Sequence, residues 1–204
     1  MSAGGEAKAP AAGRRAERSE ATRAALVAAA RQLFGRRGYA AVGTEEIVRA
    51  AGVTRGALYH HFAGKRELFE AVYERIEVEL AERIAASALQ GNAASPLEAM
   101  RAGTEMFLAA ATEPETQQIV LLDGPSVLGW DRWREIAAAN GLGLIEASLA
   151  AAIEAGEIRP LPVRPLAHLL LGALDEAAML VARAEVTAVL LALLESFAVA
   201  KDDG

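Results

Sequence analysis

The sequence predicts an all-α fold, and three of its features point to this class. Alanine and leucine supply most of the 53% of residues that are hydrophobic, while the β-branched residues that favour strands are sparse. Apolar side chains recur at the three- and four-residue spacing of one helix face along most of the chain. No segment keeps the alternation of apolar and polar residues that a half-buried strand requires. A chain of 204 residues is long enough to bury one large core or two small ones.

The first predicted helix covers residues 20–37. Residues 1–18 precede it and hold no apolar run, and their Ala, Gly, Pro and Arg are typical of a disordered tail rather than of a signal peptide. Within the helix, Leu26 and Phe34 belong to one apolar stripe. Gly38 follows it and suits a helix stop.

Two short helices are predicted next, over residues 45–51 and 55–61. Thr44 and Thr54 precede them, and a threonine in that position caps a helix by accepting a hydrogen bond from a backbone N–H. Gly52 lies between the two helices and permits a sharp turn. Two short helices joined by a tight turn, with an amphipathic helix before them, are the parts of a helix-turn-helix unit.

A long amphipathic helix is predicted from Lys65 to about residue 89. Further helices follow, divided by turn sequences that contain glycine, proline or asparagine. We therefore expect a disordered tail over residues 1–18, a helix-turn-helix domain over residues 19–64 and a larger helical domain over residues 65–204. The later helices are predicted over residues 96–111, 115–122, 126–139, 142–155, 163–183 and 185–199.

Charge is distributed unevenly along the chain. Residues 1–66 carry 12 Lys and Arg against 5 Asp and Glu, whereas residues 67–204 carry 9 against 22. A basic amino-terminal part indicates a polyanionic partner for that part alone. The alternative interpretation is ordinary solvated charge.

The composition also excludes several classes of site. The chain contains no cysteine, which excludes disulfides, thiolate metal sites and cysteine nucleophiles. Its most apolar segment is interrupted by Asp175 and Glu176, so no run approaches the roughly 18 apolar residues of a membrane span. We expect a soluble, cytoplasmic protein that has no contact with a membrane and needs no cofactor.

Helical geometry gives the second short helix one outward face. Successive residues of a helix are about 100° apart, so if Leu58 points inward, Phe62 also faces the core. His60 then falls on the outermost line, while His61 is half buried. Arg55 lies at the amino-terminal end, where a recognition helix presents its first side chains to bases.

The chemistry of this helix and its neighbours fits duplex DNA. Arg55 has the fork that matches the O6/N7 edge of guanine, and Thr54 can bond a phosphate or place its methyl against thymine. Gly56 removes bulk where the helix comes closest to the groove. Lys65 begins the next helix, where its charge and the unpaired backbone N–H groups suit a phosphate. The candidate DNA contacts are Thr44, Thr54, Arg55, Gly56, Tyr59, His60 and Lys65.

The adjacent histidines also raise the alternatives of a metal site and a catalytic site. His60 and His61 are 100° apart on a helix, so they cannot both ligate one ion as an i, i+4 pair does. The remaining histidine, His168, lies in a predicted core helix. A catalytic histidine needs an orienting carboxylate and a nucleophile in a cleft, whereas His60 is predicted on a convex ridge. We therefore predict no metal site, no catalytic residue and no enzyme.

Several elements of the region from about Thr22 to Phe69 keep a specific spacing. They are Leu33-Phe34, Gly38-Tyr39, Thr44, Ile47, Ala51-Gly52-Val53, Gly56, Leu58-Tyr59, His61-Phe62, and Lys65 with Leu68. This pattern closely resembles the DNA-binding region of the tetracycline-repressor-like (TetR/AcrR) transcriptional regulators, over about a quarter of the chain. The departures are mild: Thr54 stands where serine is common, and Val48 where alanine is usual. The resemblance implies DNA contacts by the candidates other than Gly56, a homodimer on a near-palindromic operator, and release of DNA by a small ligand.

The two predicted helices at the carboxyl terminus carry broad apolar stripes. Such a pair can form a four-helix bundle with the same pair of a second copy, as the resemblance implies. The alternative is that both stripes belong to an intramolecular core. The candidate interface residues are Leu166, Leu170, Leu174, Val181, Val189, Leu193 and Phe197.

A small-molecule effector is expected among the carboxyl-terminal helices, again from the resemblance. The candidate lining is the segment LLDGPSVLGWDRWREI, which contains both tryptophans of the chain, three residues apart. Aromatic side chains can line an apolar pocket, and a carboxylate can hold a cationic or hydroxylated ligand. The alternative is that the tryptophans pack in the core or at a dimer surface. The candidate ligand-binding residues are Met106, Phe107, Asp123, Trp130, Trp133, His168 and Asp175.

The sequence as a whole predicts a sequence-specific DNA-binding regulator that represses transcription until a ligand releases it. One alternative is a regulator that is ligand-independent or activating. A second is an α-helical enzyme, for which the chain offers no metal-ligand cluster, nucleophile–base pair or phosphate-binding glycine loop. A third is a non-specific architectural DNA binder, against which the acidic carboxyl-terminal part argues.

Overall fold

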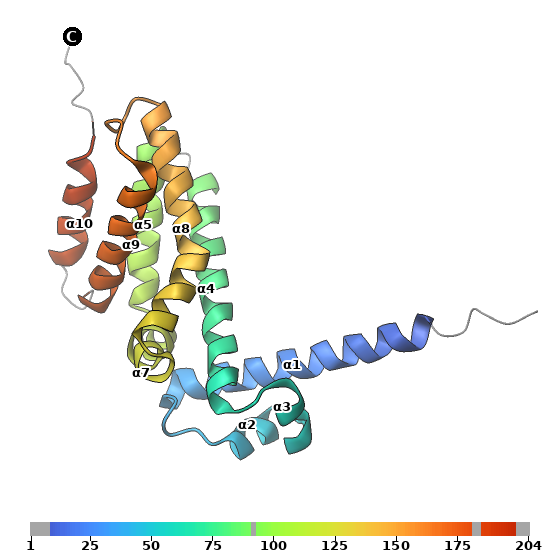
Figure 1. Ribbon diagram of the computed structural model, residues 1–204. Helices are drawn as coiled ribbons and strands as arrows, with labels where there is room; N and C mark the ends of the chain where they lie inside the picture. Colours follow the sequence, from blue (N-terminus) through green and yellow to red (C-terminus); the bar gives the residue numbers. More distant parts are fainter. Residues whose placement is uncertain (1–8, 91–92, 181–184, 199–204) are drawn as a thin grey trace, which may run out of the picture. The chain divides into compact units, whose positions relative to one another are not determined.

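The computed structural model describes residues 9–90, 93–180 and 185–198 (Figure 1). These residues form helices and turns, with one isolated bridge between Ile158 and Ala198, so the predicted all-α class is confirmed. The chain divides into two compact units, Met1–Val72 and Tyr73–Gly204. The division falls inside a helix, eight residues after the boundary that we expected between residues 64 and 65.

The amino-terminal unit is a small helical domain. It contains α1 (Ala9–Arg37), α2 (Thr44–Ala50), α3 (Arg55–His61) and the first turns of α4 (Lys65–Gln90). Each helix places its apolar positions in one shared core, as the three- and four-residue spacing predicted. The large buried side chains are Leu26, Phe34, Val42, Ile47, Leu58, Phe62, Leu68, Phe69 and Val72.

Helix α1 begins earlier than the sequence predicted. The structure has helix from Ala9, whereas residues 1–18 were expected to be a disordered tail, of which residues 1–8 lie outside the described residues. Residues 9–21 are rich in Ala, Arg and Glu, which are strong helix formers. Pro10 stands in the first turn, where a missing N–H breaks no hydrogen bond of the helix.

In its described residues, the carboxyl-terminal unit consists of the rest of α4 and seven further helical segments. Helices α5, α8, α9 and α10 are packed side by side in it (Figure 1). The predicted helix over residues 115–122 is realised as a short α-helical turn followed by a π-helical one. The segments are α5 (Pro96–Ala111), α6 (Pro114–Thr116), η1 (Gln117–Asp123), α7 (Gly124–Leu128), α8 (Trp130–Glu154), α9 (Val163–Leu180) and α10 (Glu185–Glu195).

Helix α8 replaces two helices that the sequence predicted, over residues 126–139 and 142–155. The expected break at Asn140-Gly141 does not occur: the helix continues through both residues, and Asn140 Nδ2 donates to Ile136 O of the preceding turn at 2.9 Å. Gly129, with φ of 81°, instead provides the break just before α8.

By length and composition alone, α8 is long and apolar enough to cross a membrane. The sequence had predicted no such segment. Core helices of globular domains share this composition, but only part of α8 is buried, including Trp133, Ile136 and Leu149. The hydropathy of this one helix is therefore weak evidence for a membrane span.

Candidate nucleic-acid interface and ligand cavity

The turn and cap of the helix-turn-helix unit have the geometry that the sequence predicted. Gly52 has φ of 67°, the left-handed conformation that a glycine adopts without strain. Thr54 is the N-cap of α3, and its Oγ1 accepts a hydrogen bond from Ala57 N at 3.2 Å. These two features fix the direction in which α3 leaves the turn.

Helix α3 presents the outward face that helical geometry predicted. Leu58 and Phe62 are buried in the core of the amino-terminal unit. Tyr59 and His60 are exposed, while His61 is half buried and its ring centroid lies 6.4 Å from that of Phe62. The histidine pair is thus divided between the surface and the core, as predicted.

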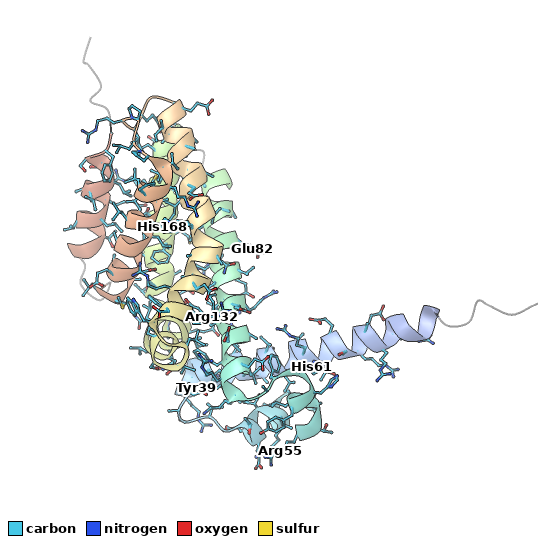
Figure 2. All side chains as sticks on the ribbon, viewed as in Figure 1. Tyr39, Arg55, His61, Glu82, Arg132 and His168 are labelled. Carbon is cyan, nitrogen blue, oxygen red and sulfur yellow. The ribbon has the colours of Figure 1, made fainter. Side chains whose placement is uncertain are left out.

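Arg55 extends into solvent from the amino-terminal end of α3 (Figure 2). Its guanidinium lies 3.4 Å from Glu45 Oε1 and 5.6 Å from the centroid of the Tyr59 ring. Both members of the ion pair are well exposed, so the pair contributes about 1 kcal/mol or less. The guanidinium is therefore oriented by its neighbours yet available to a stronger partner.

Thr44 does not cap α2, contrary to the prediction. It is the first residue of that helix, and the N-cap is Gly43, which makes no side-chain hydrogen bond. Glu45 and Glu46 occupy the first turn as predicted, where negative charge complements the helix dipole. Glu46 also pairs with Arg37 of α1, which connects the two helices.

Lys65 has an intramolecular role that the sequence did not indicate. Its Nζ donates to Tyr39 O at 2.9 Å and to Val42 O at 3.0 Å, and it lies 4.0 Å from the centroid of the Tyr39 ring. The ammonium therefore ties the start of α4 to the loop between α1 and α2. Two of its three N–H donors are committed to these carbonyls, so a phosphate can reach only the third.

A cavity in the carboxyl-terminal unit contains some of the predicted ligand-binding residues. Phe107, Trp133 and Asp175 line it, together with mainly apolar side chains of α4, α5, η1, α8, α9 and α10. Trp133 is also a structural residue, because it is 2% exposed and its Nε1 donates to Val120 O at 2.9 Å. Both interpretations of this tryptophan, pocket lining and core packing, thus apply.

The other four predicted ligand-binding residues do not line this cavity. Trp130 is 47% exposed although its ring lies 4.9 Å from that of Trp133, because it stands at the first turn of α8. His168 lies at an exposed position of α9 and does not line the cavity, although the sequence had placed it in a core helix. Met106 lies outside the lining, as does Asp123, whose Oδ2 accepts a hydrogen bond from Gln118.

The cavity also contains two residues of α4 that sequence analysis missed, Tyr73 and Glu77. Burial raises the pKa of Glu77 to about 7, against the effect of a hydrogen bond with Tyr73, and the nearby charge of Asp175 adds to the increase. Burial likewise raises the pKa of Asp175 to about 6, while the charge of Arg134 opposes the shift. A single glutamate within an amphipathic helix gives no sign in the sequence that it faces inward.

The predicted dimer residues divide between core and surface. Leu166 and Leu170 are buried in the core of the unit, and Leu174 and Phe197 pack partly against it, so these four belong largely to the intramolecular core. Val181 lies outside the described residues. Among the side chains that the structure describes, the large apolar ones exposed on α9 and α10 are Leu169, Met179, Leu180, Val189 and Leu193.

Comparisons with known proteins identify family matches within both units. A family model described as bacterial regulatory proteins of the tetR family matches residues 26–72. A second model, described as a tetracyclin repressor-like C-terminal domain, matches residues 97–197. The matched regions contain the helix-turn-helix unit and most of the helices around the cavity.

Individual relatives point to the same family. A TetR-family transcriptional regulator of known crystal structure from Pectobacterium atrosepticum is 36% identical, with a TM-score of 0.72, over 88% of this chain and 91% of that one. The TetC protein of transposon Tn10 from Escherichia coli is 29% identical over 76% of this chain and 78% of its own length. The regulator TtgR from Pseudomonas putida is 36% identical over 42% of this chain and 40% of its own. The chain belongs to the TetR family and is a helix-turn-helix, DNA-binding transcriptional regulator.

Proposed function

We propose that this regulator is a cytoplasmic repressor that binds a near-palindromic operator as a homodimer and is released by a small ligand. The observation that carries the DNA-binding half of the proposal is the arrangement of α3. Leu58 and Phe62 anchor the helix in the core, and Arg55, Tyr59 and His60 project from it into solvent. A short, rigidly anchored helix with cationic and hydrogen-bonding side chains on its outer face can enter a major groove.

Each outward residue of α3 has a proposed role. The guanidinium of Arg55 donates to the O6 and N7 atoms of a guanine. This contact is stronger than the surface ion pair between Arg55 and Glu45, so Arg55 exchanges the one for the other favourably. Thr54 contacts a phosphate or the methyl of thymine, and Tyr59 and His60 contact phosphates. Thr44 and the backbone N–H groups at Lys65 reach phosphates on either side of the groove.

Gly56 supports close approach of DNA to this helix. A glycine inside a helix weakens it by roughly 0.5–1 kcal/mol relative to alanine. Among described atoms, a Cβ at Gly56 would meet Thr54 Oγ1 at 3.9 Å and nothing nearer. Since the fold itself leaves room for a side chain, we attribute the glycine to the surface of a bound partner.

The exposed apolar side chains of α9 and α10 support the homodimer. Leu169 is 73% exposed and Val189 is 68% exposed, and Leu193 lies one turn after Val189. Apolar side chains that gather on the surface of two neighbouring helices favour burial against a second surface. In a twofold dimer the same two helices of each copy supply both surfaces.

The cavity supports release by a ligand. A ligand that binds the DNA-free state more tightly than the DNA-bound state shifts the protein towards the DNA-free state. By linkage, bound DNA lowers the affinity for the ligand by the same factor by which the ligand lowers the affinity for DNA. The cavity lies among helices of the carboxyl-terminal unit, and α4 continues from its lining residues into the unit that contains α3. We propose that α4 transmits the change.

Selection of bound fragments from genomic DNA tests the proposed function. A homodimeric repressor selects fragments with two half-sites in inverted orientation, and transcription from the neighbouring promoter rises when the regulator is removed. Fragments without any shared sequence would indicate the architectural alternative, and a fall in transcription would indicate an activator. The neighbouring genes also narrow the chemistry of the ligand.

A further inference from the structure

The cavity of the carboxyl-terminal unit combines an apolar wall with two buried carboxyl groups. Glu77 of α4 and Asp175 of α9 both line it, and each is 9% exposed. The described residues that line the cavity include no lysine, arginine or histidine. Two carboxyl groups in one apolar cavity without a cation inside it are costly to ionise.

Asp175 has an unused hydrogen-bonding atom in this cavity. Its Oδ2 is buried and finds no hydrogen-bond partner among the described residues. Arg134, whose charge acts on Asp175, is exposed on α8, and its Nη2 lies over Gly172 of α9 instead of bonding that oxygen. Buried carboxylate oxygens in native structures are normally satisfied, so this atom is open to a partner beyond the described residues.

Glu77 competes with a backbone carbonyl for the hydroxyl of Tyr73. The hydroxyl of Tyr73 donates to Trp133 O at 3.2 Å and is also hydrogen-bonded to the Glu77 carboxyl. A hydroxyl has one hydrogen to donate, so it cannot donate to both acceptors at once. When the hydroxyl donates to Trp133 O, it cannot stabilise the charged form of Glu77.

We propose that this cavity binds a small organic cation, an amine carried on an apolar body, whose ammonium group is held by Asp175 and Glu77. The proposal rests on the proposed function, because it names the chemical class of the releasing ligand. A neutral hydroxyl would satisfy Oδ2 but leave the buried negative charge, whereas an ammonium supplies both the donors and the opposite charge.

The size of the cavity limits the apolar body. Its volume is about 160 Å³. An apolar cavity of about 150 Å³ in another protein accepts a benzene ring, so one ring, or an alkyl chain of similar volume, fits. Phe107 and Trp133 provide aromatic faces, which also attract cations.

Calorimetric titration of the full chain with 2-phenylethylamine tests the proposal. The matched neutral compound is 2-phenylethanol, which has the same ring and chain and a hydroxyl in place of the ammonium. At pH 8 we expect the amine to bind about tenfold or more tightly than the alcohol, the ratio that a difference of about 1.4 kcal/mol produces. Equal affinities would overturn the proposal.

Two substitutions locate the cation. Asp175→Asn and Glu77→Gln should each weaken amine binding about tenfold while leaving the alcohol nearly unchanged. The matched controls are Glu176→Gln, at the exposed neighbour of Asp175, and Glu82→Gln, at an exposed position of α4. Amine affinity that is unaffected by the two cavity substitutions, or lowered equally by the controls, would contradict the assignment.

The pH dependence of the unaltered protein provides a test that needs no variant. The titratable and charged groups facing the site are Tyr73 and Glu77 from α4, Asp175 from α9 and, from outside the lining, Arg134 of α8. At pH 5.5 both carboxyl groups are largely protonated, since their pKa values are raised to about 7 and about 6, while an alkylamine stays charged. Amine affinity should therefore fall about tenfold or more from pH 8 to pH 5.5. An unchanged affinity would overturn the proposal.

Operator binding, measured separately with the selected DNA, distinguishes this proposal from the proposed function. Loss of site-specific DNA binding together with intact amine preference would refute the repressor assignment and leave the cation site standing. Site-specific binding with no preference for the amine would refute the cation site alone. Release of the operator by the amine and not by the alcohol supports both.

Discussion

The Nζ of Lys65 donates to the carbonyl oxygen of Tyr39 at 2.9 Å and lies 4.0 Å from the centroid of the same residue's ring. Phe34 and Phe69 pack against that ring, with centroids 5.6 and 5.3 Å away. The lysine therefore secures the loop after α1 to the aromatic core of the amino-terminal unit. The position of Lys65 at the start of α4 had suggested a phosphate contact. The two hydrogen bonds give Lys65 a structural role as well.

Lys65→Ala should destabilise the amino-terminal unit. The substitution removes two hydrogen bonds from a charged donor and a cation–π contact, and a charge-assisted hydrogen bond contributes about 1.5–3 kcal/mol. Thermal unfolding followed by circular dichroism measures the loss. Arg15→Ala, at an exposed position of α1, is the control and should change stability by about 0.5 kcal/mol or less. Equal melting temperatures for Lys65→Ala and the unaltered protein would refute the structural role.

Arg55→Ala should leave stability almost unchanged and relax base preference. Arg55 is exposed and its pair with Glu45 is a surface pair, whereas a bidentate contact with guanine is worth about 1–3 kcal/mol of discrimination. Binding to a library randomised at the operator measures the preference at each position. Glu45→Ala removes the partner of Arg55 without removing the guanidinium, and we expect it to preserve the preference. An Arg55→Ala protein with the original preference would exclude base reading by this residue.

Replacing two different glycines by alanine should change the stability of the protein in opposite directions. A Cβ at Gly124 would lie 2.8 Å from Trp133 Cδ1, so Gly124→Ala forces the buried indole to move and should cost about 1–3 kcal/mol. Gly143 lies in α8 and is exposed, and no described atom lies within 4 Å of the Cβ it would gain. Gly143→Ala should therefore stabilise the protein by up to about 1 kcal/mol. Chemical denaturation measures the free energy of unfolding of both variants. A Gly124→Ala protein as stable as the unaltered one would refute the prediction.

A charge on the exposed face of α10 should prevent dimerisation. Val189→Glu places a carboxylate at a side chain that is 68% exposed in the single chain, so it is tolerated by a monomer and disfavoured in an apolar interface. Sedimentation at micromolar concentration should show a monomer. Leu122→Glu, at an exposed leucine of η1, is the matched control and should leave a dimer. If Val189→Glu also sediments as a dimer, the interface lies elsewhere.

The buried carboxyl groups should make the protein less stable as the pH rises. The pKa of Glu77 is raised from 4.5 to about 7 and that of Asp175 from 3.8 to about 6, so the folded state binds protons more tightly than the unfolded state. The free energy of unfolding should then fall as the pH increases from about 4 to about 7, and Glu77→Gln should flatten this dependence. Thermal unfolding across that range measures the slope. A stability that rises over the same range would mean that a cation already neutralises the pair.

The surface of α3 could be predicted from the sequence because it depends on local geometry. A rotation of 100° per residue and the inward direction of Leu58 are sufficient to turn His60 outward and Phe62 inward. The same reasoning failed for Trp130 and Trp133, which lie three residues apart. Their rings are close, but one stands at an exposed helix start and the other is covered by neighbouring segments. Periodicity assigns residues to a face, and the neighbouring helices decide whether that face is buried.

The sequence by itself determined that this protein is helical, that it belongs with the TetR regulators, and which side chains α3 presents to solvent. These properties depend on residue types and spacings within a few turns of the chain. The tertiary structure alone decided that Lys65 secures a loop, that Leu166 and Leu170 belong to the core, and that Glu77 and Asp175 share one cavity although 98 positions separate them in the chain. Contacts between distant segments depend on how the helices pack, which no local pattern of residues specifies.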